Sequence, residues 1–176
     1  SPTSSRSCDP GDMSDTRRRL VDAATRVFAE QGVENGSLLE VARRAGQRNR
    51  GAVHYHFGSP VGLLVAVLEQ YTGFLAEREG ELLARAARTP GTELAPVLEA
   101  VVRPAVELAE TGWRGRCYLV VVAELAEADQ AALDPEVAAA LARTGGYEVY
   151  DLLTRRMPEL PEPVLTERLS LLTGFI

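Results

Sequence analysis

The 176-residue chain contains no lysine, one tryptophan, two cysteines and two histidines, and all nineteen of its basic residues are arginines. It has no run of about eighteen apolar residues, so we expect no helix that spans a membrane. The N-terminus lacks the apolar core of a signal peptide, which indicates a cytoplasmic protein. Cys8 lies in a polar tail and Cys117 in an apolar stretch, so we expect no structural disulfide. We attribute the absence of lysine to a compositional bias.

The sequence also lacks the residue patterns of common catalytic and metal sites. It has no CxxC or HExxH motif, no acidic cluster beside its histidines, and no glycine-rich phosphate loop. His54 and His56 stand two positions apart on an expected helix, where they point in different directions and cannot easily share one ion. No serine lies in a nucleophile elbow. We therefore expect no metal, no cofactor and no enzymatic activity.

Apolar residues recur at intervals of three and four along most of the chain, which predicts an all-α fold. Residues 1–13 lack this periodicity and are expected to form a disordered N-terminal arm, with minor-groove contact through Arg6 as the alternative. The expected helices cover residues 14–31, 38–45, 50–57, 60–88, 92–110, 113–126, 133–157 and 162–176. Pro104 should bend the helix that contains it, and Gly145-Gly146 should weaken another.

The stretch from Ser37 to Phe57 has the pattern of a helix-turn-helix. Ser37 and Glu40 have the spacing of a capping box, and Gly46 stands where a left-handed residue ends the first helix. A polar turn follows, and the second helix carries Val53 and Phe57 on its inner side. Two short helices joined through a glycine-containing turn are typical of DNA-binding proteins.

The same stretch resembles the DNA-binding domain of the TetR family of transcriptional regulators. The residues that carry the resemblance are Val41-Ala42, Ala45-Gly46, Gly51-Ala52-Val53, Tyr55-His56-Phe57 and Gly58-Ser59-Pro60. The turn is one residue farther from the histidine–phenylalanine pair than in the commonest version, as in a subgroup with a QRN-type turn. Pro60 stands where the family usually has a lysine that contacts DNA phosphate.

The resemblance implies an N-terminal three-helix head, residues 14–58, joined by a long helix to a helical ligand-binding and dimerisation bundle, residues 59–176. The family closes with two helices that pair with a partner subunit, and the second is absent or short here, so we expect a truncated C-terminus. The implied partners are a palindromic duplex operator, a second copy of the chain and an unknown small-molecule ligand. The implied function is that of a homodimeric repressor, which the ligand releases from its operator.

We expect the turn and the second helix of the motif to contact DNA. Arginine can bond bidentately to guanine, and glutamine or asparagine to adenine. The expected contact residues are Arg48, Asn49, Arg50, His54, Tyr55, Gln47, Ser37 and Arg17. Asn49 could instead cap the second helix, Tyr55 could pack within the head, and His56 is expected to brace the helix end.

The charge distribution agrees with a head that meets DNA. The whole chain has a net charge of −6, but residues 14–57 carry +3 and residues 58–176 carry −8. A basic end on an acidic body is the electrostatic footprint of a surface that meets phosphate. A chance fluctuation could account for the +3 alone, so this charge supports the motif and does not replace it.

The helical body offers candidate ligand-binding residues near Pro104. A bent helix beside one that carries aromatic residues can leave an apolar cavity with a few polar groups. The candidates are Arg103, Glu107, Trp113, Arg116, Tyr118, Glu124, Tyr147 and Tyr150, and plain core packing is the alternative for each. Two other functions share these features: an activator or corepressor-dependent regulator, and a helical protein-binding module that has lost DNA binding.

Overall fold

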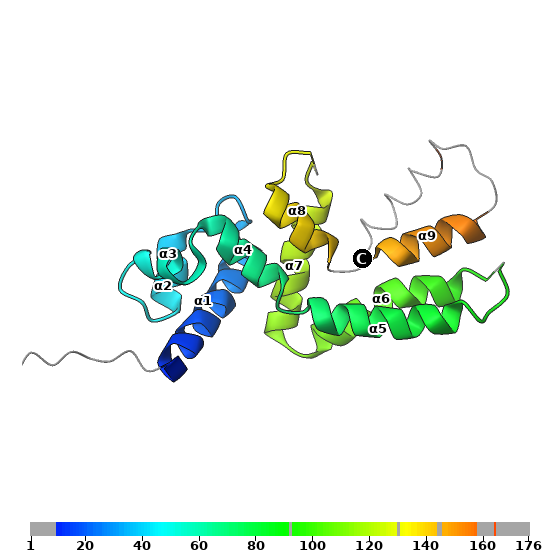
Figure 1. Cartoon of the computed structure of the whole chain (residues 1–176), viewed down its shortest axis with the longest axis horizontal. Helices are drawn as coiled ribbons and strands as arrows, with labels where there is room; N and C mark the ends of the chain where they lie inside the picture. The colour runs from blue at the N-terminus through cyan, green and yellow to red at the C-terminus, as the bar shows by residue number, and fades with distance from the viewer. Residues whose placement is uncertain (1–9, 92, 130, 144–145, 158–163, 165–176) are drawn as a thin grey trace, which may run out of the picture.

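The computed structural model describes residues 10–91, 93–129, 131–143, 146–157 and 164, and every regular element within these ranges is a helix. The helices are α1 (Pro10–Gln31), α2 (Leu38–Arg44), α3 (Gly51–Phe57), α4 (Pro60–Leu68), α5 (Thr72–Ala86), α6 (Ala95–Glu110), α7 (Trp113–Glu127), α8 (Pro135–Ala142) and α9 (Tyr147–Arg156). Figure 1 shows α1 to α4 gathered at one end of an elongated molecule, with α5 and α6 extended toward the other. The predicted all-α fold is confirmed.

Two predicted elements lie at the limits of the described residues. Helix α1 begins at Pro10, before the predicted start at residue 14, so the predicted disordered arm over residues 1–13 was too long. Proline is tolerated at a helix start because the N–H that it lacks would have no intrahelical partner there. Residues 1–9 lie outside the described part of the chain, as does the helix predicted over 162–176 apart from Val164.

The long helix predicted to connect the head to the body is wrong, because the chain breaks between α4 and α5 at residues 69–71. No glycine or proline lies within these three residues. Bonds from distant elements stabilise the break instead: the Tyr118 hydroxyl donates to the Leu68 carbonyl at 3.0 Å. The Gln70 amide donates to the Thr25 hydroxyl at 2.8 Å. The bond from Tyr118 satisfies a carbonyl that the end of α4 leaves without an intrahelical partner.

The helix predicted over residues 133–157 is also two helices, α8 and α9. Gly146 precedes α9 with a φ of 96°, a backbone conformation that favours glycine. Its N–H donates to the carboxylate oxygens of Glu79 at 3.0 and 2.9 Å. Burial raises the pKa of Glu79 above its ordinary value, although this hydrogen bond opposes the shift.

The main hydrophobic core crosses the boundary predicted at residue 58. It joins α1 to α4 with α7 and α8, and its buried members include Leu20, Val27, Val53, Val67 and Val121. Buried side chains follow closely along α1 from Leu20 to Phe28, on more than one side of the helix. A helix that is apolar on two sides needs cover on both, so α2 and α4 alone do not complete the head.

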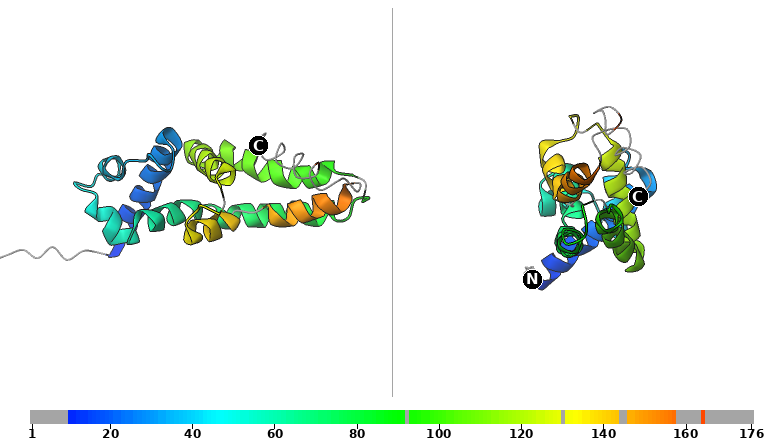
Figure 2. Two further views of the ribbon diagram at one scale, coloured as in Figure 1. Left: turned by 90° about the horizontal axis from the view of Figure 1, so that it is seen from above. Right: turned by 90° about the vertical axis from the view of Figure 1, so that its right-hand side faces the viewer.

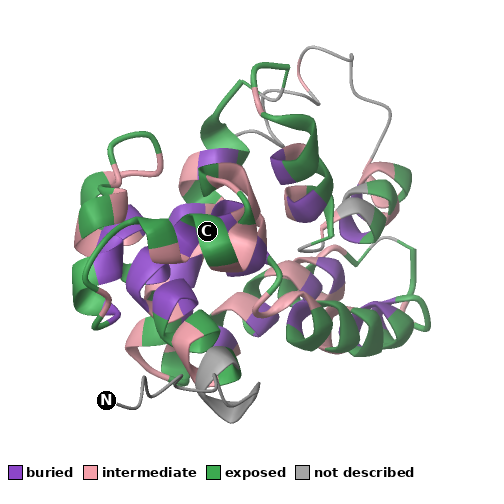
Figure 3. Cartoon of the chain, turned by 60° about the vertical axis from the view of Figure 1, so that its left-hand side comes forward, coloured by how far each residue is buried: buried purple, intermediate pink, exposed green. Residues whose placement is uncertain are grey.

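A second core lies among α5, α6 and α9, which we call the distal bundle. It contains Leu82, Val97 and Val149. Figure 2 shows these helices running together away from the head, and Figure 3 shows buried residues on the inward sides of the helices. A small third cluster, formed by Leu75, Leu108 and Tyr118, connects the two cores.

No single helix among the described residues is long and apolar enough to cross a membrane. One bent pair, Gly51–Phe57 with Pro60–Ala86, meets the criteria of length and composition, with an angle of 62° between its parts. Five residues of α4 in this pair are buried within the protein.

Candidate nucleic-acid interface

The start of α2 is fixed by Ser37. Its Oγ accepts a hydrogen bond from the backbone N–H of Glu40 at 3.4 Å, as an N-cap does. The second half of the predicted capping box is absent, because the Ser37 N–H donates to the side chain of Gln31 at 3.3 Å. The Glu40 carboxylate turns to arginines on its own helix instead.

The end of α2 forms a Schellman motif around Gly46. Gly46 has a φ of 76°, and its N–H donates to the Arg43 carbonyl at 3.1 Å. The next N–H, of Gln47, donates to the Ala42 carbonyl at 2.8 Å. These two bonds close the helix and turn the chain toward α3. The left-handed glycine predicted from the sequence is confirmed.

The turn into α3 places several polar side chains in solvent. Asn49 accepts a hydrogen bond from the Gly51 N–H at 2.9 Å, so its oxygen supports the start of α3, as the capping alternative anticipated. Its amide N–H groups remain available. Arg48, Arg50 and His54 are exposed, Gln47 is partly buried, and Tyr55 is 69% exposed. The structure thus brings the predicted turn and α3 residues to one end of the head.

Most arginines of residues 14–57 are paired with carboxylates. Glu40 accepts bonds from Arg43 at 2.8 and 2.7 Å and from Arg44 at 2.7 Å. These bonds, from Arg43 first and then Arg44, lower the pKa of Glu40 from 4.5 to about 2. The remaining pairs are Arg44 and Arg26 with Glu30, and Arg18 and Arg19 with Asp15.

Three arginines of the head, Arg17, Arg48 and Arg50, form no ion pair with any residue that the structure describes. The Arg17 guanidinium instead lies over the Phe57 ring, 4.9 Å from its centroid, next to the C-terminal end of α3. All three side chains are exposed. They are also the three arginines predicted to contact DNA, so the predicted contact surface carries three guanidinium groups that no described carboxylate neutralises.

The predicted ligand-binding residues are dispersed. Tyr118 is fully buried and bonded to the Leu68 carbonyl, and burial raises the pKa of its hydroxyl. Glu107 is paired with Arg78 at 2.7 and 2.8 Å, which lowers the pKa of Glu107. Because these groups already have partners, they are not free to bind a ligand in this conformation.

Two other members of that set, Arg103 and Trp113, line different hollows. Arg103 lines a shallow hollow of about 320 Å³ between α5 and α6, whereas Trp113 lines a separate one. Arg116 donates to the Ala109 carbonyl at 3.1 Å. Glu124 accepts from the Val33 N–H at 2.9 Å. The side chains of Tyr147 and Tyr150 lie outside the described residues, although their backbone belongs to α9.

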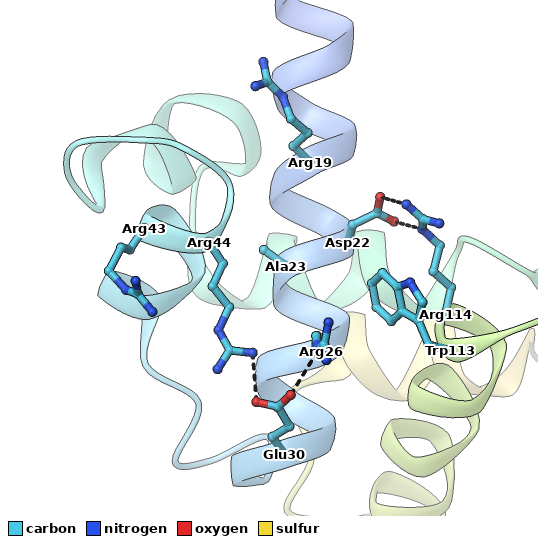
Figure 4. A pocket seen from close by; sticks show the side chains of 9 residues that line it. All are labelled: Arg19, Asp22, Ala23, Arg26, Glu30, Arg43, Arg44, Trp113 and Arg114. Carbon is cyan, nitrogen blue, oxygen red and sulfur yellow. Dashed lines mark hydrogen bonds and ion pairs between the residues drawn. The ribbon is translucent and has the colours of Figure 1, made fainter.

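The hollow at Trp113 lies between the head and α7 and has a volume of about 550 Å³ (Figure 4). Its walls come from α1, α2 and the first turn of α7. Five arginines, two carboxylates and the indole face it: Arg19, Arg26, Arg43, Arg44, Arg114, Asp22, Glu30 and Trp113. The described residues contain no group of three or more His, Cys, Asp or Glu side chains that could hold a metal ion.

A sequence profile of the bacterial regulatory proteins of the tetR family matches residues 20–67, which include α2 and α3. Over 54 residues the chain is 48% identical to the uncharacterized HTH-type transcriptional regulator TtgW of Pseudomonas putida. That match covers 31% of this chain and 40% of TtgW. Residues 20–67 therefore match the TetR family of regulators, and the resemblance predicted from the motif is confirmed.

Sequence similarity extends beyond the head at a lower level, and the fold of the chain is similar to solved structures. The chain is 32% identical over 108 residues to AcrR of Shigella flexneri, which covers 61% of this chain and 48% of AcrR. It spans about half or less of the length of these relatives. Among solved structures, AibR in complex with isovaleryl coenzyme A and operator DNA has a TM-score of 0.59 at 17% identity. PfmR from Thermus thermophilus has a TM-score of 0.58 at 20% identity, and these matches cover 90% and 89% of this chain and 84% of each structure.

Several contacts of the chain were not predicted from its sequence. Arg114 binds Asp22 through two hydrogen bonds of 2.9 Å each, across 92 positions of sequence. Arg26 and Arg114 both lie against the ring of Trp113. Ion pairs between distant helices leave no periodic signal, so only the three-dimensional arrangement reveals them.

Proposed function

We propose that this TetR-family chain is a sequence-specific, DNA-binding regulator of transcription that acts as a homodimeric repressor in the cytoplasm. The observation that carries the proposal is the placement of Arg17, Arg48 and Arg50. They are the arginines of the head without a described carboxylate partner, and two of them stand at the start of α3. An unneutralised guanidinium group can bind phosphate or guanine without first losing an internal ion pair.

In this proposal α3 enters the major groove of duplex DNA. Arg48 and Arg50 bind guanine edges, and the free amide of Asn49 donates to a base while its oxygen supports the turn. His54 and Tyr55 extend the contact along α3. Gln47 is a further candidate for bonding to adenine, and Ser37 and Arg17 contact the DNA backbone. Ser37 lies at the N-terminal end of α2, where exposed backbone N–H groups favour phosphate.

Helix α4 contributes little to phosphate binding at its own start. Pro60 has no N–H, and the Gly62 N–H is already bonded to the Ser59 hydroxyl at 3.0 Å. With proline in place of a cationic side chain, this helix start has neither the charge nor its full set of donors. The phosphate contacts therefore depend on Arg17 of α1 and on Ser37 at the start of α2.

The two heads of a dimer would occupy half-sites about 34–36 Å apart in successive major grooves. The described part of the chain contains the head and part of a helical body, and the body holds the ligand and the partner subunit. AibR, which has a similar fold, was crystallised with both a small molecule and operator DNA. A ligand that favours a conformation with wrongly spaced heads lowers the affinity for the operator.

Selection of bound sequences from random duplexes tests the proposal. The wild-type chain should enrich a palindromic site, and Arg48→Ala with Arg50→Ala should abolish that enrichment. A matched control is Arg43→Ala with Arg44→Ala, which removes two arginines whose charge Glu40 and Glu30 already compensate. Absence of enrichment at low ionic strength, with no dependence of binding on salt, would instead indicate a protein-binding module. A reporter assay then separates repression from activation.

A further inference from the structure

Helix α7 is joined to the head at its N-terminal end by charged and aromatic contacts. The guanidinium of Arg114 forms two bonds of 2.9 Å to the carboxylate of Asp22 on α1. The neighbouring Trp113 ring lies between two guanidinium groups, 5.3 Å from that of Arg26 and 4.9 Å from that of Arg114. Figure 4 shows these side chains at the junction of α1 and α7. We call Asp22, Arg26, Trp113 and Arg114 the clamp.

Helix α7 is also joined to the head near its other end. Glu124 accepts a hydrogen bond of 2.9 Å from the N–H of Val33, in the loop directly after α1. Between the two attachments, Val121 and Leu125 of α7 belong to the same buried core as α1. Both helices run from the clamp toward the Glu124 contact, so they lie parallel. Two attachments separated along parallel helices prevent the head from pivoting on α7.

The clamp is not an ordinary surface ion pair. The Asp22 side chain is only 20% exposed, and its two oxygens meet the two nitrogens of one guanidinium group. A bidentate pair restricts orientation as well as distance. Loss of Arg114 leaves a mostly buried carboxylate without its partner, which favours movement of α1 away from α7.

The attachments of the distal bundle are of another kind. Its core is separate from that of the head, and the third cluster of Leu75, Leu108 and Tyr118 joins the two. The chain passes between the two cores at Tyr71–Thr72, at Thr111–Gly112 and near Gly146. Gly112 and Gly146 have φ values of 127° and 96°. Short connections with glycine are suited to absorb changes of backbone angle.

We infer that the clamp makes the head, α4, α7 and α8 one rigid unit, and that the distal bundle moves against this unit. Asp22, Trp113 and Arg114 are then positioning residues, because they fix the head relative to the body without contact with DNA. Ligand-driven changes reach α3 through movement of the whole unit, and the boundary at Gly58–Ser59 does not flex. This inference rests on the proposed function only for its effect on DNA.

The rigid unit is tested without DNA by distances between paired spin labels. The two native cysteines are replaced (Cys8→Ser and Cys117→Ser), and spin labels are attached to cysteines introduced at exposed positions. Leu39→Cys on α2 is paired either with Val120→Cys on α7 or with Val102→Cys on α6. Labelled chain is diluted with unlabelled chain to suppress distances between subunits. We expect a narrow distribution for the pair of α2 with α7 and a broader one for α2 with α6. Equal widths would overturn the rigid unit.

The clamp is tested by reversing the charges of Arg114 and Asp22 in the same spin-labelled chains and measuring the same distances. Arg114→Asp should broaden the α2–α7 distribution, and Arg114→Asp combined with Asp22→Arg should narrow it again. Arg114→Gln serves as a milder variant if melting shows that the reversal does not fold. Arg103→Asp, which breaks a pair with Glu99 within α6, should leave the α2–α7 distribution unchanged. An Arg114→Asp or Arg114→Gln chain with the wild-type distribution would overturn the clamp.

The effect on DNA is measured as preference for half-site spacing. The selected operator is compared with one in which a base pair is inserted between the half-sites. We expect the wild-type chain to prefer the selected operator by about tenfold, Arg114→Asp to lose this preference, and the double reversal to restore it. A purely structural role would lower the melting temperature and leave the preference unchanged, which would overturn the inference. If the wild-type chain binds no duplex, the proposed function fails, whereas the spin-label distances still decide the clamp.

Discussion

The buried hydroxyl of Tyr118 is one of the groups that stabilise the break between α4 and α5, and Tyr118→Phe removes it. Tyr118 has no exposed surface, and its hydroxyl donates to the Leu68 carbonyl at the end of α4 at 3.0 Å. The substitution keeps the aromatic ring and its edge contact with Tyr71, whose centroid is 5.0 Å away. Only the hydrogen bond is lost, so any change in stability measures this bond.

The expected loss is about 1–3 kcal/mol, because a buried carbonyl without its donor costs more than the bond itself contributes. For a chain of this size that corresponds to a fall in melting temperature of about 2–4 °C for each kcal/mol. Chemical denaturation and thermal melting, both followed by circular dichroism, measure the two quantities. Tyr71→Phe is the matched control, because no hydrogen bond of the Tyr71 hydroxyl is found among the described residues. Equal stability of the two variants would refute the role of Tyr118 at the break.

Three further predictions concern the head. Gly46→Ala should destabilise the chain by about 1–2 kcal/mol, because the backbone at Gly46 is left-handed. Gly80→Ala, on the exposed side of α5, should instead stabilise the chain by up to about 1 kcal/mol. The denaturant midpoints of both variants check this, and destabilisation by Gly80→Ala would contradict it. The pKa of Glu40 is lowered from 4.5 to about 2, so its charged carboxylate stabilises the fold fully above pH 4.5 and less as the pH falls toward 2. The difference in melting temperature between the wild type and Glu40→Gln should therefore shrink over that pH range. A constant difference would contradict the assignment. If Arg17 neutralises one phosphate, Arg17→Ala should reduce by about 0.9 the slope of the logarithm of the binding constant against the logarithm of the salt concentration. Arg50→Ala should cost about 1–3 kcal/mol of binding free energy and relax the preference at one base. A uniform loss of affinity for all sequences in site selection would reassign Arg50 to phosphate.

The head was predictable because its signals are local. Ser37 as a cap, Gly46 as a left-handed stop, and Val53 at helical spacing each act within a few residues, and the structure has all three. The capping box failed in one half because Gln31, from the preceding helix, took the Ser37 N–H. That competition is invisible in the spacing of Ser37 and Glu40.

The body was less predictable because long-range contacts determine it. Apolar spacing runs without interruption through residues 61–75, yet the chain breaks within this stretch, where Tyr118 binds the Leu68 carbonyl and Thr25 binds the Gln70 side chain. The ligand candidates were chosen for residue type near Pro104, and the fold gave several of them other partners. The pair of Asp22 with Arg114 had no local signal, because its members lie on helices far apart in the sequence.

Base contact by α3 is tested most directly by replacing purines with 7-deazapurines in the duplex that the wild-type chain selects. This change removes the N7 acceptors of the major groove and leaves Watson–Crick pairing and phosphates intact. We expect wild-type affinity to fall at the guanines of each half-site, and Arg50→Ala to become insensitive at one of them. Wild-type affinity that is unchanged on the substituted duplex would show that α3 does not read the major groove.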